Sequence, residues 1–137
     1  MNEFKNIREE LQGDITLCAI LKDGRFFKSY ERGIKPIMEQ LKSEPHFFEN
    51  AILADKVVGK AAAFLAVYSK VSGIYAKTVS APALSVLNEY KIPCEYETLV
   101  ARIENRTKTG LCPMESLCMN ISAPEDAYLA LRNKVYG

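Results

Sequence analysis

The chain lacks an excess of charge of either sign. Its 18 Lys and Arg residues are balanced by 17 Asp and Glu residues, which gives a formal net charge of +1. Tight binding to DNA or to an anionic membrane draws on a surplus of basic residues. The balance therefore argues against a protein that holds such polyanions mainly by charge.

Long apolar runs are missing as well. The most apolar stretch, residues 61–71, includes Ser69 and Lys70 and is far shorter than the ~20 residues of a membrane-spanning helix. The charged start of the chain contains no apolar segment typical of a secretory signal. Four cysteines in a chain without such a signal are typical of reduced thiols. We expect a cytoplasmic protein with no membrane contact.

Repeats and flexible linkers are also absent from the 137 residues, which predicts a single domain over residues 1–137. The chain has one histidine, His46, far in sequence from Cys112 and Cys118. The spacing of these two cysteines fits no usual zinc motif. We therefore expect neither a bound metal nor a cofactor.

The pattern of apolar residues, prolines and glycines predicts an alternation of strands and helices. An Asp23-Gly24 pair between apolar runs predicts a hairpin of residues 15–21 and 26–30. The expected helices are residues 3–11, 36–43, 59–72 and 82–90, one from Pro113, and residues 124–134 capped by Ser122. Besides the hairpin, the expected strands are residues 51–54 (ending at Asp55), 74–79 and 95–100.

This element order predicts an α/β fold. Strands separated by helices imply parallel crossovers, while the hairpin adds an antiparallel edge. The expected product is a three-layer α/β/α sandwich around a mixed, roughly five-stranded sheet. Residues 59–72 are apolar on nearly every side, which is typical of a helix enclosed between layers.

Gly59 and Lys60 lie at the expected start of that central helix, after the strand that ends at Asp55. Free N–H groups and the helix dipole favour an anion at such a place. Glycine lets a ligand approach the backbone, and lysine adds a positive charge. We therefore take Asp55, Gly59 and Lys60 as candidate ligand-binding residues. Alternatively, Gly59 only packs against the sheet and Lys60 only covers the helix end.

The run Cys112-Pro113-Met114-Glu115 is the most chemically suggestive one. Proline suits a first helical turn, so Cys112 would lie at the positive end of a helix, which favours a reactive thiolate. Glu115 could carry a proton or fold back on the helix start. Cys112 and Glu115 are our candidate catalytic residues. The alternative is a packed cysteine and a glutamate that only caps the helix.

The stretch ADKVVGKAAAFLAVYSKV, followed by NRTKTGLCPMESLC, resembles a small, mostly bacterial family of unknown function. That family is similar in fold to the cytidine-deaminase superfamily, and the resemblance runs from about Ile15 to Lys134. Asn105 and Arg106 belong to the matching motif and join the candidate ligand-binding residues. The resemblance implies a deaminase-like order of hairpin, helix, strand, central helix, strand, helix and strand.

The zinc motifs of the superfamily are missing. A zinc deaminase needs His or Cys with Glu at the start of the central helix, and Pro-Cys-x-x-Cys at the start of the next. The corresponding segments here, residues 59–62 and 80–83, contain no such ligand. We expect a zinc-free cleft that binds a small anionic or nucleotide-like ligand, with catalysis left open. The alternative is a non-catalytic interaction or regulatory module, either as a homodimer or on nucleic acid.

Overall fold

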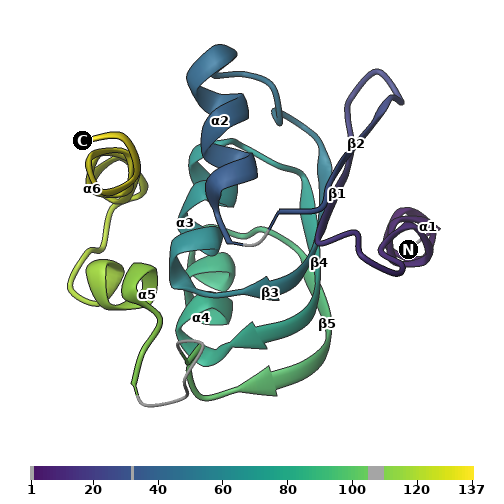
Figure 1. Cartoon of the computed structure of the whole chain (residues 1–137). Coiled ribbons are helices and arrows are strands. Elements are labelled where there is room, and N and C mark those ends of the chain that lie inside the picture. Colours follow the sequence, from purple (N-terminus) through teal and green to yellow (C-terminus); the bar gives the residue numbers. More distant parts are fainter. Residues whose placement is uncertain (1, 32, 105–109) are drawn as a thin grey trace.

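A computed structural model describes residues 2–31, 33–104 and 110–137 (Figure 1). The elements in chain order are α1 (Asn2–Glu10), β1 (Leu17–Ile20), β2 (Phe26–Ser29), α2 (Lys35–Ser43), β3 (Ile52–Val58), α3 (Lys60–Tyr68), β4 (Gly73–Ser80), α4 (Ala81–Glu89), β5 (Cys94–Val100), α5 (Pro113–Cys118) and α6 (Pro124–Tyr136).

The strands form one mixed five-stranded sheet in the order β2-β1-β3-β4-β5. Strand β1 is antiparallel to both of its neighbours, whereas β3, β4 and β5 are parallel. The predicted hairpin is confirmed. The Leu21 N–H donates to the Arg25 carbonyl (2.8 Å), and Gly24 adopts φ +90°, which glycine accepts without steric strain. The α/β class and the mixed sheet are therefore as predicted.

Helices cover the two faces of the sheet unequally (Figure 1). Helix α1 lies on one face, while α2, α3 and α4 lie on the other, and α5 and α6 pack outside α3. The protein therefore has four layers, where three were expected. Helix α3 is enclosed between the sheet and the α5–α6 layer, which explains why it is apolar all round.

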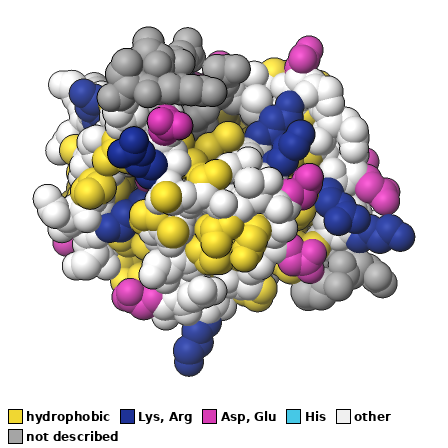
Figure 2. All heavy atoms as spheres, turned by 90° about the horizontal axis from the view of Figure 1, so that it is seen from below, with side chains coloured by type: hydrophobic (Ala, Val, Ile, Leu, Met, Phe, Trp, Pro, Cys, Tyr) yellow, Lys and Arg dark blue, Asp and Glu magenta, His cyan; other side chains and the backbone are white. Residues whose placement is uncertain are grey.

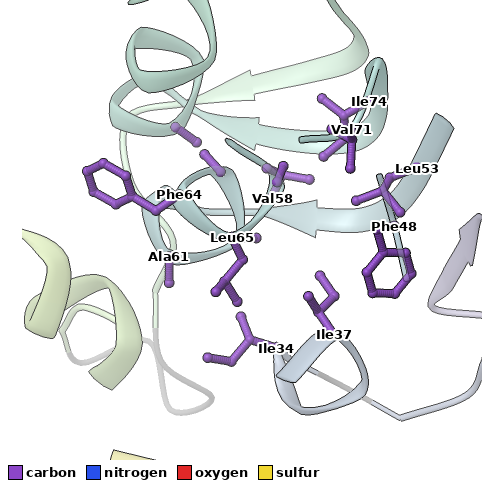
Figure 3. Close-up of a cluster of buried hydrophobic side chains, with 14 of the residues drawn as sticks. Ile34, Ile37, Phe48, Leu53, Val58, Ala61, Phe64, Leu65, Val71 and Ile74 are labelled. Carbon is purple, nitrogen blue, oxygen red and sulfur yellow. The ribbon is translucent and has the colours of Figure 1, made fainter. Parts of the chain in front are cut away.

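The main core fills the space between the sheet and α2, α3 and α4 (Figure 3). Phe64 and Leu65 of α3 are 1% and 0% exposed, and Leu65 points toward Ile34 and Ile37 (Figure 3). A smaller cluster on the other face joins α1 to the sheet. It consists of Phe4, Ile7, Cys18, Ala54 and Tyr75.

Two predicted element ends and one predicted helix cap are wrong. Strand β3 continues to Val58, because the Lys56 N–H still donates to the Thr16 carbonyl (3.1 Å) beyond Asp55. Helix α3 ends at Tyr68 rather than at residue 72, because the backbone turns to φ +60° at Lys70. Helix α6 follows Ala123, and no side chain caps it. Ser122 is therefore not the cap.

Candidate functional site

Glu115 joins the N-termini of two helices. Its carboxylate accepts hydrogen bonds from the backbone N–H of Lys60 and from that of Ala61 (3.4 Å), both in the first turn of α3. It also accepts from the Ser80 hydroxyl (3.3 Å). Ser80 is the N-cap of α4, where its oxygen accepts from the Ala83 N–H (3.2 Å). The anion at the start of the central helix is therefore a side chain of the protein itself.

Gly59 is necessary for this contact. A Cβ atom built on Gly59 would lie 2.7 Å from the Glu115 Cδ and 2.9 Å from each carboxylate oxygen. Glu115 is 5% exposed, so it has little room to move aside. The close approach predicted at Gly59 exists, and the group that approaches is Glu115.

The Lys60 ammonium group bonds to a backbone carbonyl and not to this carboxylate. Its Nζ donates to the Met119 carbonyl at the end of α5 (3.0 Å) and lies 5.7 Å from the centre of the Phe64 ring. Within the part of the chain that the structure describes, no carboxylate lies within 4.0 Å of this ammonium. Among the described residues, the Lys60 ammonium group is therefore held by a backbone carbonyl and forms no ion pair.

An open groove of about 280 Å³ runs beside Lys60. Its walls come from α3, from α4 and from the link between α5 and α6. The lining residues are Lys60, Phe64, Pro82, Ser85, Val86, Glu89, Tyr90, Ile121 and Ser122. The Tyr90 hydroxyl donates to the Ser122 carbonyl (3.2 Å). We call this space the Lys60 groove.

The two cysteines of the α5 segment differ in burial. Cys112 is half-buried and precedes α5, as predicted, but its side chain makes no capping hydrogen bond. Cys118 is buried, and burial, aided by the nearby Glu115 charge, raises the pKa of its thiol to about 11. Cys118 therefore stays protonated at neutral pH, whereas the reactivity of Cys112 stays a prediction.

Asp55 lies inside β3 and not at its end. It pairs in register with Leu17 and Ala76, and its carboxyl oxygen accepts from the Val57 N–H (3.3 Å). Burial raises the pKa of this carboxyl to about 7. Asp55 takes no part in the hydrogen bonds around Glu115 and does not line the Lys60 groove.

The remaining candidate residues, Asn105 and Arg106, lie outside the described residues. Residues 2–31, 33–104 and 110–137 contain no group of three His, Cys, Asp or Glu side chains placed to hold a metal ion. None of the described helices is long and apolar enough to cross a membrane.

The face seen in Figure 2 bears basic side chains at separate points, with acidic ones between them and hydrophobic ones near the middle.

On the hairpin, Phe26 and Tyr30 are 53% and 66% exposed. Lys28 is paired with Glu10 (2.8 Å), however, and Arg25 with Asp23 (2.7 Å). These ion pairs reduce the positive charge that single-stranded nucleic acid would need.

The sequence alone did not reveal two features of the site. Ser80 connects Glu115 to α4, and residues of α4 form one wall of the groove. The run Ser80-Ala81-Pro82 does predict a capped helix start. Nothing local shows, however, that a glutamate 35 residues further along the chain bonds to Ser80.

The fold and the site define an α/β domain in which a buried carboxylate links two helix N-termini beside an open groove. Residues 6–135 match the family described as "TM1506: Domain of unknown function (DUF1893)", and the chain belongs to that family. Its structure is similar to the crystal structure of a DUF1893 family protein, TM1506, from Thermotoga maritima. The two share 30% identity with a TM-score of 0.86, over 97% of this chain and 90% of that chain. No curated protein sequence matches.

Proposed function

We propose that this protein has a cytidine-deaminase-like fold without the zinc site and binds a small anionic, nucleotide-like ligand in the Lys60 groove. The order of hairpin, helix, strand, central helix, strand, helix and strand supports the fold assignment. The four free thiols support a reducing compartment such as the cytoplasm.

The residues present do not fit a catalytic zinc ion. Zinc deaminases hold the metal between the starts of the central helix and the next helix. Here the starts of α3 and α4 supply backbone N–H groups and the Ser80 hydroxyl, and the Glu115 carboxylate already bonds to them. We therefore propose no hydrolytic step that depends on zinc.

The position of the Lys60 ammonium group in the groove, without an ion pair among the described residues, supports the ligand proposal. A phosphate or carboxylate can bind an ammonium group that has no acidic partner. Pro82, Val86 and Tyr90 supply apolar and aromatic surface on the same groove, which suits a flat base or ring. Glu89 and Ser85 add polar atoms that could accept hydrogen bonds from a ligand.

Calorimetric titration with the nucleoside 5′-monophosphates CMP, UMP, AMP and GMP tests this proposal. At least one should bind, and the matching nucleoside without phosphate should bind more weakly. Lys60→Gln should weaken binding about ten- to hundredfold, because a hydrogen bond to a charged group contributes about 1.5–3 kcal/mol.

Lys134→Gln is the matched control, because Lys134 is exposed in the last turn of α6 and does not line the groove. This variant should bind like the unmodified protein. Absence of binding by all four nucleotides, or equal loss in both variants, would refute a nucleotide site at Lys60.

A further inference from the structure

Strand β5 is exposed in a way that is unusual for a parallel strand. Parallel strands are normally buried on both faces, yet residues 95–99 of β5 are all exposed. Tyr96 is 41% exposed and Leu99 is 48% exposed. Because side chains alternate along a strand, these two lie on opposite faces of the sheet. Apolar surface is thus open to solvent on both sides of one edge.

The backbone of this edge is also available for pairing. Strand β5 pairs with β4 on one side, and β4 is its only partner among the described residues (Figure 1). The Ile74 N–H donates to the Pro93 carbonyl (2.9 Å), and Ile74 is in register with Cys94. The backbone N–H and C=O groups of the odd-numbered residues of β5 therefore point toward β4. The N–H and C=O groups of Tyr96, Thr98 and Val100 point away from β4, toward the outer edge of the sheet.

We propose that β5 pairs with β5 of a second copy of this chain, in antiparallel orientation. Two five-stranded sheets would then join into one sheet of ten strands around a two-fold axis. The strand interior contains no proline, and proline is one of the features that keep exposed edges from pairing. This inference does not depend on the ligand proposed for the Lys60 groove.

Charge distinguishes between the registers that such a pair could adopt. A two-fold axis at Glu97 would place this carboxylate opposite its own copy. An axis at Tyr96 would place Glu95 opposite Glu97 of the partner subunit. Like charges directly opposite one another destabilise a strand pair. Both registers are therefore unfavourable.

An axis at Thr98 avoids these repulsions. Thr98 then faces its own copy, Tyr96 faces Val100 of the partner subunit, and Glu97 faces Leu99 of the partner subunit. A threonine pair and an aromatic residue beside a β-branched one are favourable cross-strand neighbours. The strand is thus complementary to itself in this register, and we take it as the dimer register.

Light scattering measures the oligomeric state directly. The unmodified protein should have twice the chain mass of 15.4 kDa. Thr98→Lys should yield a folded monomer, because two ammonium groups would meet at the axis. Thr98→Val, which keeps a β-branched side chain, should remain a dimer. A monomeric unmodified protein, or a dimer that Thr98→Lys does not disrupt, would overturn the proposal.

Disulfide trapping tests the register. In the proposed pairing, positions 97 and 99 of the two copies face each other in a pair without direct hydrogen bonds, which lies close enough for a disulfide. Oxidation of the double variant Glu97→Cys/Leu99→Cys should therefore give a covalent dimer that reductant separates. Neither single variant should crosslink. Efficient crosslinking of Glu97→Cys alone would instead place the axis at Glu97 and overturn the Thr98 register.

Discussion

At the scale of single residues, the most informative contact is the one between Glu115 and the start of α3. A carboxylate that accepts N–H groups at a helix N-terminus is stabilised by both hydrogen bonds and the helix dipole. The sequence predicted an anion at Gly59-Lys60 and a capping or catalytic role for Glu115 as separate features. The structure brings them together across 55 positions of the chain.

Asp55 gives a prediction of pH dependence. Burial raises the pKa of its carboxyl to about 7, from 3.8 for an ordinary aspartate. The folded protein therefore binds a proton more tightly than the unfolded chain. This contribution to stability is fully present below pH 3.8 and is lost as the pH rises through 7. The loss is at most about 4 kcal/mol, at about 1.4 kcal/mol per pKa unit, and partial exposure of the residue reduces it.

Asp55→Asn removes this titration and keeps an oxygen that can accept from the Val57 N–H. The variant should be more stable than the unmodified protein at pH 8.5 and no more stable at pH 4. Urea unfolding at the two pH values measures the difference. If the free energy of unfolding of the two proteins changed with pH in the same way, Asp55 would be well solvated.

At the scale of elements, local sequence signals predicted most of the fold because they act over a few residues. The Asp23-Gly24 pair set the hairpin, and Pro36, Pro82 and Pro113 each lie in the first turn of a helix. The end of β3 was missed because Asp55 and Lys56 look like a polar turn. The strand continues there because Thr16, just before β1, bonds to Lys56 and because β4 pairs with Val57 and Val58. Local sequence does not show these partners.

Substitutions of Phe64 test whether α3 is the central helix of the fold. Phe64 is 1% exposed within the main core. Phe64→Asp should abolish soluble expression, because an unpaired buried charge costs several kcal/mol against a total stability of about 5–15 kcal/mol. Phe64→Leu should stay folded and lose only part of the packing energy. Comparison of soluble yield and thermal unfolding separates the two. A stably folded Phe64→Asp protein would contradict a central position for α3.

At the scale of the whole molecule, the α5–α6 layer completes the site although it lies late in the chain. Glu115 anchors α5 to α3 and α4, and Lys60 bonds to the end of α5. The mixed sheet followed from element order. The position of this outer layer could not be predicted, because it depends on contacts between residues far apart in sequence.

Above all, we infer that the Glu115 carboxylate holds the starts of α3 and α4 together. The most direct measurement is the free energy of unfolding of Glu115→Gln, which keeps the size of the side chain and removes its charge. We expect the free energy of unfolding to fall by about 2–3 kcal/mol, because buried N–H donors would meet an amide instead of a carboxylate. Glu125→Gln, at an exposed position in the first turn of α6, should change stability by no more than about 1 kcal/mol. A Glu115→Gln protein as stable as this control would contradict the account.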